Sequence, residues 1–248
     1  MTPINVISYN IHKGMSPLNR LVKLQSMGQA LSDLPIDILC LQEVQGQNLK
    51  RAIAFNEYPD NPQHDWFGEY LSLSHSYGQN ASYGHGHHGN ATLSRHRLDP
   101  KHNVNITVSA LEKRGVLHSE ITPSDWGVPV VVLNAHLNLL ESDRTKQYQA
   151  ISEYIASEID KDKPLILAGD FNDWAKKSGQ FLGQLGLHEV FYSKYGKHPA
   201  TFPARLPMLS LDRIYVRHLR VLSAQVYGGV PWSDLSDHLP IGARLTLV

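Results

Sequence analysis

Residues 164–174 read PLILAGDFNDW, an apolar run that ends at a glycine and is followed at once by polar residues. A short apolar run bounded by a turn residue is typical of a buried strand. Gly169 allows a sharp turn after that strand. Alternate residues of an extended segment share a face, so Asp170 and Asn172 are expected to project to the same side. The alternative is an ordinary tight turn, which also favours glycine, aspartate and asparagine.

Polar side chains stand at the ends of apolar runs in other parts of the chain as well. These positions are Asn10, Glu43, His136, Asp212, Asp237 and His238. Charged groups at strand ends are costly unless they are paired or bound to a metal. Polar groups that come from many strand ends are also how a rigid sheet builds one catalytic site. The pattern therefore makes a metal-dependent phosphoester hydrolase the leading hypothesis.

Hydrophobic patterning predicts many short strands with a few inserted helices. Strands are expected over 4–10, 36–44, 90–95, 103–110, 115–121, 128–136, 164–169 and 239–247. Helices are expected over 19–33, 141–160 and 175–186. Residues 212–228 are predicted to form a hairpin or one bent strand, and 45–88 is the least regular segment. This order predicts an α/β (α+β) fold of two packed sheets covered by helices, as a single domain over 1–248.

The composition, with 42% hydrophobic and 19% charged residues, is that of a packed globular enzyme. The formal net charge is zero, so no global basic field gathers nucleic acid, although a bound divalent cation would add local positive charge. Cys40 is the only cysteine, which excludes an internal disulfide. No run approaches the ~18 apolar residues of a membrane span. We therefore expect no membrane span, a cytoplasmic location and a monomer.

Three of the polar positions suit a divalent metal. Mg²⁺ and Mn²⁺ prefer oxygen ligands and usually keep some of their waters. Glu43 and Asp237 are natural carboxylate ligands, with Asn10 as a neutral third. The alternatives are a surface carboxylate after a strand for Glu43 and a turn aspartate for Asp237.

The histidines at strand ends are candidate acid–base groups, because imidazole titrates near neutrality. His136 and His238 occupy such positions, although a lone histidine there is often structural. Asp212 is expected to hydrogen-bond to the His238 ring and to fix its tautomer. The alternative for Asp212 is an ion pair with the adjacent Arg213.

Seven motifs together resemble the endonuclease/exonuclease/phosphatase superfamily, which has the DNase I-like fold. In the family's order they are YN, LQEV, GNATLSR, NAH, GDFND, LDRIYV and SDHLP, and they run from residue 9 to residue 240. The chain is most similar to short bacterial members that also carry IHKG, HHGN, EKRG and GDFNDW. No single motif is decisive, whereas seven in order are strong support.

The resemblance implies a four-layer sandwich of two mostly antiparallel sheets flanked by helices, with the site at one edge. It implies Mg²⁺- or Mn²⁺-dependent cleavage of a phosphoester by in-line attack of water. The implied metal ligands are Asn10, Glu43 and Asp237. The implied catalytic residues are His136, Asp170, Asn172, Asp212 and His238. Arg114 matches a position that often contacts phosphate, and the alternative is a surface arginine.

Two departures from the family pattern bear on the site. DNase I-type members place a glutamate near the GNATL position to pair with the first histidine, whereas this chain reads HHGNATL, so His136 lacks that partner. A polar triplet also follows the first strand, in which Lys13 is expected either to bind phosphate or to be a solvated loop lysine. Asn90 is expected to contact the substrate phosphate. The histidines 85, 87 and 88 before it are expected to lie in a plain solvated loop or in a loop that faces the substrate, with dedicated metal binding as the least favoured alternative.

Three hypotheses cover the substrate. The first is DNA, because phosphate contacts carry most nucleic-acid affinity without reading sequence, and the segment 66–88 and several basic residues are placed to supply them. The second is a phospholipid head group or another small phosphoester, which the absence of a basic surplus fits better. The third is a binding protein with a dead site, which the nearly complete set of catalytic positions disfavours. DNA is the leading hypothesis.

Overall fold

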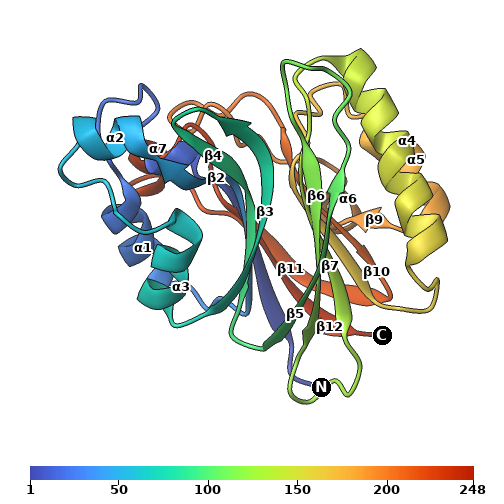
Figure 1. The fold of residues 1–248 in the computed structure, drawn as a ribbon. Coiled ribbons are helices and arrows are strands. Elements are labelled where there is room, and N and C mark those ends of the chain that lie inside the picture. The colour runs from blue at the N-terminus through green and yellow to red at the C-terminus, as the bar shows by residue number, and fades with distance from the viewer.

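The computed structural model describes residues 1–248, and two six-stranded β-sheets face each other within it (Figure 1). Helices lie on the outer faces of both sheets, so the fold is a four-layer sandwich. This architecture confirms the predicted fold class. The N- and C-termini lie together at the lower end of the molecule in Figure 1.

The first sheet has the strand order β11-β12-β1-β2-β4-β3. Its strands are β11 (Leu219–Val226), β12 (Ile241–Leu247), β1 (Ile4–Asn10), β2 (Ile38–Asn48), β4 (Gly86–Ser94) and β3 (Ser74–Tyr83). The first and last strands of the chain, β1 and β12, pair antiparallel in its interior. The parallel neighbour β2 brings the carboxyl end of a second strand beside that of β1.

The second sheet has the order β5-β6-β7-β8-β10-β9. Its strands are β5 (Arg97–Asn105), β6 (Gly115–Thr122), β7 (Val130–His136), β8 (Leu165–Asp170), β10 (Asp212–Arg217) and β9 (His188–Glu189). The β7–β8 pair is parallel, and its register sets His136 opposite Asp170. Apart from this pair and β1–β2, all strand pairs in the two sheets are antiparallel.

Helices cover the outer faces of both sheets (Figure 1). On the first sheet they are α1 (Leu24–Ser32), α2 (Leu49–Ala54), α3 (Gln63–Leu71) and α7 (Trp232–Leu235). On the second they are α4 (Glu141–Glu158) and α5 (Ser178–Leu182), while α6 (Val190–Tyr195) contacts β10 and β11. Short 3₁₀ turns occupy His12–Gly14 and Gly183–Leu185. None of the helices combines the length and the apolar character that a membrane span requires.

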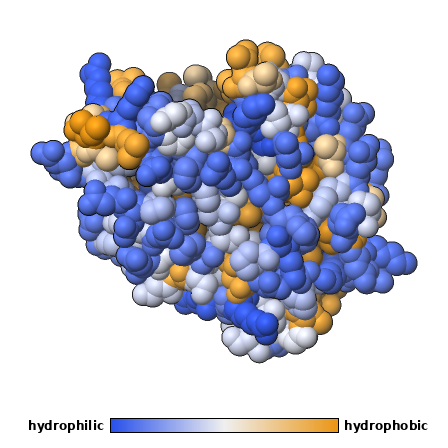
Figure 2. All heavy atoms as spheres, in the orientation of Figure 1, coloured by the Kyte–Doolittle hydropathy of each residue, from blue (hydrophilic) through white to orange (hydrophobic).

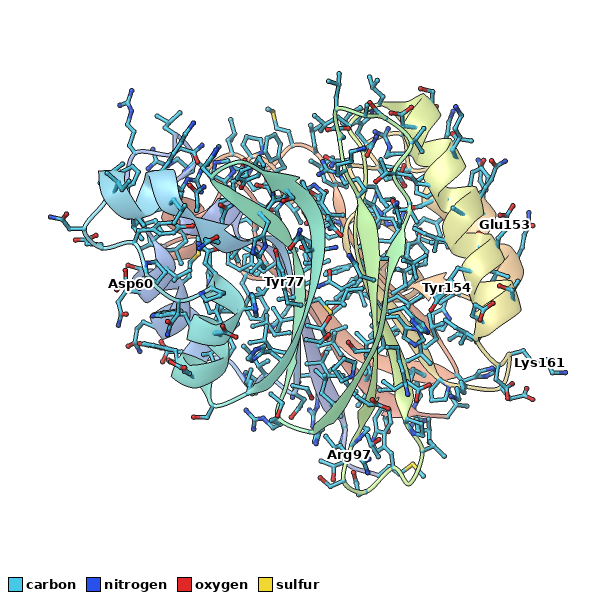
Figure 3. All side chains as sticks on the ribbon, viewed as in Figure 1. Asp60, Tyr77, Arg97, Glu153, Tyr154 and Lys161 are labelled. Atoms are coloured by element: carbon cyan, nitrogen blue, oxygen red, sulfur yellow. The ribbon has the colours of Figure 1, made fainter.

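The core consists of three apolar layers. The layer between the sheets is built by inward-facing residues such as Val6, Val132 and Ile166, and the other two lie between each sheet and its helices. Each fully buried side chain of this kind contributes about 1.5–3 kcal/mol. Helix α4 shows the pattern clearly, because Tyr154 points toward the sheet and Glu153 points outward (Figure 3). The Tyr154 hydroxyl lies 2.7 Å from His118 Nδ1 on β6.

A buried polar bridge joins the two sheets through the middle of the sandwich. Gln42 Nε2 on β2 donates to Asn134 Oδ1 on β7 at 2.9 Å. The Asn134 amide in turn donates to the backbone carbonyls of Leu41 and Ala91 at 3.0 and 2.9 Å. Hydrogen bonds are directional, so this bridge fixes the offset of one sheet against the other, which apolar packing alone specifies less sharply.

Two predicted elements differ from the structure in the amino-terminal third. The segment 45–88, expected to be irregular, instead folds into α2, α3, β3 and the start of β4. The strands in this segment are rich in glycine, asparagine and tyrosine and do not alternate between apolar and polar residues. They are stabilised by cross-strand pairing, which the sequence pattern does not reveal. The helix expected over 19–33 begins later, at Leu24, because Met15 and Val22 form a β-bridge first.

Of the two predictions for 212–228, the hairpin was wrong, whereas the bent strand agrees with the structure, in which the two halves belong to different sheets. Strand β10 pairs with β8 and β9 in the second sheet, whereas β11 pairs with β12 in the first. Only His218 separates them, and its φ of 57° provides the change of direction. The chain therefore crosses from one sheet to the other within a single residue.

Candidate active site

A cleft of about 680 Å³ opens where the carboxyl ends of β1, β7 and β8 meet the loops at one end of the sandwich. Nine of the predicted site residues line it: Asn10, Lys13, Glu43, Arg114, His136, Asp170, Asn172, Asp237 and His238. They come from both sheets, so the cleft straddles the sandwich. Asp212 and Asn90 do not line the cleft but lie buried beneath its wall.

Asp170, at the end of β8, is the centre of the buried part of the site. Its Oδ2 accepts a hydrogen bond from Asn10 Nδ2 at 3.0 Å, and it lies 3.4 Å from His136 Nε2 and 3.6 Å from His238 Nε2. Burial raises the pKa of the Asp170 carboxyl to about 6, against the lowering effect of His238. Asp170 is thus a carboxylate that can take up a proton near neutrality.

Gly169 makes the placement of Asp170 possible. Its φ is +148°, and a Cβ added there would lie 1.8 Å from the carbonyl oxygen of Ala135 on the parallel neighbour β7. Only glycine adopts this backbone at so short an approach. The sharp turn expected from the sequence is in fact a close strand-to-strand contact.

His238 is held by a carboxylate on the side opposite Asp170. Its Nδ1 lies 3.0 Å from Asp212 Oδ2, which also accepts a hydrogen bond from Thr201 Oγ1 at 2.5 Å. Burial alone would lower the His238 pKa, but Asp212 and Asp170 outweigh it and raise the pKa to about 10. The ring is therefore an imidazolium. The alternative pairing of Asp212 with Arg213 does not occur, because that guanidinium points to Asp173, 3.8 Å away.

His136 differs from His238 in charge. It is buried at the end of β7, and burial together with the nearby Arg114 keeps its pKa well below 6.5. Its nearest carboxylate is Asp170, which it shares with His238, and no glutamate stands behind it. The two histidines thus present one neutral and one protonated ring to the same aspartate.

The other side of the cleft carries Glu43 and Asp237. His12 Nδ1 lies 3.2 Å from Asp237 Oδ2 and 4.0 Å from Glu43 Oε2, while Lys13 Nζ lies 3.1 Å from the same glutamate oxygen. Burial would raise the Glu43 pKa, but Lys13, His136 and His12 together lower it well below its usual value. Glu43 is therefore ionised throughout the neutral range.

Strained backbone conformations gather at this site. His12, Lys13, Glu43 and Asn172 all have positive φ, between 46° and 62°. Glu43 lies at a register shift between β2 and β4, a bulge that turns its side chain toward the cleft. Such conformations cost of order 1–3 kcal/mol each and are kept where they serve a function.

The remaining predicted residues have varied surroundings. Arg114 Nη2 lies 3.4 Å from Glu112 Oε1, and its buried Nε has no partner. Asn172 Nδ2 donates to the Leu137 carbonyl at 2.9 Å, which leaves Oδ1 free of a hydrogen bond. Asn90 Nδ2 donates to two backbone carbonyls, each at 3.2 Å, so its amide stabilises the strands beneath the cleft.

Two groups of side chains offer ligands for a metal. Asp170, Asp212 and His238 form a compact buried group whose ligand atoms lie within 4.8 Å of one another. However, an imidazolium has no lone pair for a metal, and Asp212 is already paired with it. The oxygen-rich group of Asn10, Glu43 and Asp237 fits a hard divalent cation better. Glu43 Oε2 there is buried and lacks a well-formed hydrogen bond, and Lys13 Nζ lies 3.1 Å from it.

An apolar rim around the cleft could not be predicted from the sequence. Leu111, Leu139, Leu209 and Trp174 line it, and Leu111 is 95% exposed. Neighbouring loop residues Leu140, Leu206 and Met208 are also more than 60% exposed. Figure 2 shows apolar side chains gathered along this upper edge of the molecule. Loop residues without periodicity carry no pattern from which such clustering can be predicted.

Comparison with known proteins identifies the family of this chain. Residues 7–238 match the model of the Endonuclease/Exonuclease/phosphatase family. The Escherichia coli protein YbhP, itself uncharacterized, is 37% identical over 98% of this chain and 96% of its own length. The chain belongs to the endonuclease/exonuclease/phosphatase family, whose members are metal-dependent phosphoesterases.

Two solved structures illustrate how widely this fold is used. TDP2 of D. rerio, complexed with a single-strand DNA product, has a TM-score of 0.73 at 18% identity and covers 99% of this chain and 100% of its own. The mannosyl-6-phosphatase Bt3783 of Bacteroides thetaiotaomicron has a TM-score of 0.72 at 18% identity and covers 98% and 100%. At this identity the likeness establishes the fold, while substrates differ between the two.

Proposed function

We propose that this chain is a metal-dependent phosphodiesterase and that its substrate is an amphiphilic phosphodiester such as a phospholipid head group. The observation that carries the catalytic part is the convergence of His136, His238 and Asn10 on Asp170, across the cleft from Glu43 and Asp237. Paired proton-transfer groups beside a carboxylate cluster are what hydrolysis of a phosphoester requires.

Each residue has a distinct role in this proposal. Asp170 accepts the proton of the attacking water, since its raised pKa makes it a base near neutrality. Protonated His238, held by Asp212, neutralises the developing charge on the phosphoryl oxygens. Neutral His136 lies on the same side and completes the hydrogen bonds around the reacting group. Arg114 and Lys13 are the nearest cations to contact the phosphate.

Asn10, Glu43 and Asp237 are the residues that would hold Mg²⁺ or Mn²⁺. Such an ion supplies Lewis-acid stabilisation of charge on a phosphoryl oxygen. The ionised Glu43 and the neighbouring Asp237 carboxylate support this assignment, because hard cations select carboxylate oxygens. The identity of the ion is part of the proposal.

Glu43→Gln is expected to raise the Mg²⁺ or Mn²⁺ concentration needed for half-maximal activity by at least ~10-fold, since it replaces an anionic ligand by a neutral one. Titrating activity against each metal measures this shift. Glu158→Gln, a matched change on the exposed face of α4, should leave the titration unchanged. The same metal dependence in Glu43→Gln and wild type would remove Glu43 from the ligand set.

The apolar rim favours an amphiphile over DNA. Burying an exposed leucine is worth about 1.5–3 kcal/mol, and an acyl chain beside the scissile phosphate would cover several at once. A DNA backbone instead needs several unpaired cations. Of the three lysine and arginine side chains in the cleft, Lys13 and Arg114 already face Glu43 and Glu112, which leaves Lys113.

DNA remains the second candidate, supported by the open cleft between the sheets. A three-substrate assay separates the two: phospholipid vesicles, plasmid DNA and a chromogenic phosphodiester, each with Mg²⁺ and with Mn²⁺. We expect vesicle hydrolysis with little dependence on salt. DNA cleavage that falls steeply as salt rises would favour a nuclease instead. If all three substrates stay intact, the phosphodiesterase proposal fails.

A further inference from the structure

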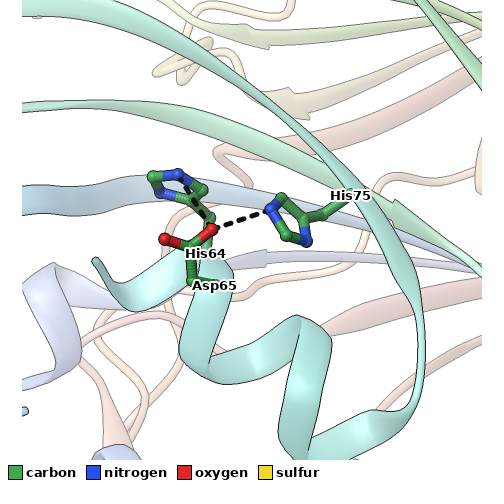
Figure 4. A group of neighbouring side chains, drawn as sticks. All are labelled: His64, Asp65 and His75. Carbon is green, nitrogen blue, oxygen red and sulfur yellow. Dashed lines mark ion pairs between the residues drawn. The ribbon is translucent and has the colours of Figure 1, made fainter. Parts of the chain in front are cut away.

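A further cluster of side chains of the types that bind metals lies away from the cleft, between α3 and β3 on the outer side of the first sheet. His64 and Asp65 stand on the first turn of α3, and His75 stands on β3 (Figure 4). The His75 Nε2 lies 2.9 Å from Asp65 Oδ1, and the His64 Nε2 lies 3.6 Å from the same oxygen. None of the three lines the cleft.

The spacing of these atoms matches a metal site. All three ligand atoms lie within 4.8 Å of one another. In a tetrahedral zinc site with bonds near 2.0–2.1 Å, neighbouring ligand atoms are about 3.3 Å apart. The distances from Asp65 Oδ1 to the two histidine nitrogens, 2.9 and 3.6 Å, lie on either side of that value. Small side-chain rotations would therefore bring these atoms to the spacing of a zinc site. Two imidazoles and one carboxylate with an open fourth position are a recognised zinc arrangement.

His64 itself points to a missing ligand. Its Nε2, the ring nitrogen nearest Asp65, lies 3.6 Å from Oδ1, which is too far for a hydrogen bond and leaves this nitrogen available to a metal. The ring cannot easily turn away, because it stacks on Tyr77 at 4.2 Å between centroids.

Gly68 gives the His75 ring room beside α3. A Cβ at that position would lie 2.6 Å from His75 Nδ1 and 3.1 Å from the Leu73 backbone oxygen. Any larger residue would push the ring of His75 away from Asp65. Gly68 therefore allows α3 and β3 to pack closely where His64, Asp65 and His75 lie.

We propose that His64, Asp65 and His75 form a zinc site that ties α3 to β3. Nitrogen ligands favour Zn²⁺ over Mg²⁺ and Mn²⁺, so the site selects a different ion from the carboxylate-rich cleft. Asp65 and His75 are 39% and 31% exposed in their side chains, which leaves the ion a path from solvent. The ion would join His64 and His75 to the Asp65 carboxylate that lies between them, and so connect the helix to the strand.

The test is zinc binding to the full chain after chelator treatment, in millimolar Mg²⁺ that occupies the cleft. Calorimetry should show one tight Zn²⁺ equivalent, and zinc should raise the melting temperature. Co²⁺ in its place should give a visible absorption band from nitrogen and oxygen ligands. His75→Gln and Asp65→Asn should each weaken zinc binding at least ~10-fold and abolish the rise in melting temperature.

His102→Gln provides the matched control, because it removes an exposed histidine on β5 of the other sheet. This variant should bind zinc as the wild type does. Circular dichroism establishes that the Asp65→Asn variant, which keeps the side-chain volume, is folded. The proposal is overturned if wild-type protein binds no tight zinc equivalent in Mg²⁺, or if either folded variant retains it.

Discussion

Asp170→Asn is expected to lower kcat by at least ~10²-fold while the protein stays folded, on the usual scale for lost acid–base catalysis. The substitution keeps the shape of the side chain but removes the proton acceptor at the centre of the site. It also turns an amide toward Asn10 and two histidines that now face a carboxylate oxygen. Steady-state kinetics on whichever substrate the three-substrate assay identifies measure the loss.

Asp162→Asn is the control for this change. Asp162 is exposed on the loop between α4 and β8, and its substitution removes a carboxylate of the same type outside the cleft. Its kcat should equal that of the wild type. If Asp170→Asn retained more than a tenth of the wild-type kcat, the proposed role of this aspartate would be refuted.

Gly169→Ala is expected to lower the free energy of unfolding by at least ~3 kcal/mol, which combines a strained backbone with an overpacked contact. The added methyl would lie 1.8 Å from the Ala135 carbonyl oxygen, so β7 and β8 must move apart. That movement separates His136 from Asp170, which are register partners on these strands. Urea unfolding followed by circular dichroism gives the change in stability.

Gly183→Ala is the control, because it shows how much stability is lost when a glycine without a close neighbour is replaced by alanine. A Cβ at Gly183 meets nothing within 4 Å, and its φ is −60°. The free energy of unfolding of the Gly183→Ala variant should differ from that of the wild type by less than ~0.5 kcal/mol. An unfolding midpoint for Gly169→Ala equal to that of the wild type would show that the close approach is not required.

The apolar strands and the residues at their ends could be predicted because both signals are local. The apolar composition of a run such as residues 165–169 predicts a buried strand. The charged residue that ends such a run must be paired, because an unpaired buried charge is costly. The pairing of Asp212 with His238 follows the same logic, and the 3.0 Å distance agrees with it. The side chains that this pattern brings together form one cleft.

Features that depend on tertiary contacts could not be predicted. The chain passes from the second sheet to the first at His218 because β10 pairs with β8 whereas β11 pairs with β12. No residue pattern near His218 predicts these two pairings. Thr201 supports Asp212 from a proline-rich loop, and nothing in its sequence context marks a hydroxyl donor. The strands within 45–88 were missed because their faces are half polar and their stability comes from pairing.

The division of the site between the sheets has a consequence for the newly made chain. Asp170 and His136 belong to one sheet, Asn10 and Glu43 to the other, and Asp237 and His238 directly precede β12. Strand β12 pairs with β1, although these two strands are the farthest apart in the sequence of all the strands described. Asp237 and His238 therefore reach the cleft only when β12 has paired with β1, so the set of site residues is complete only in the fully folded chain.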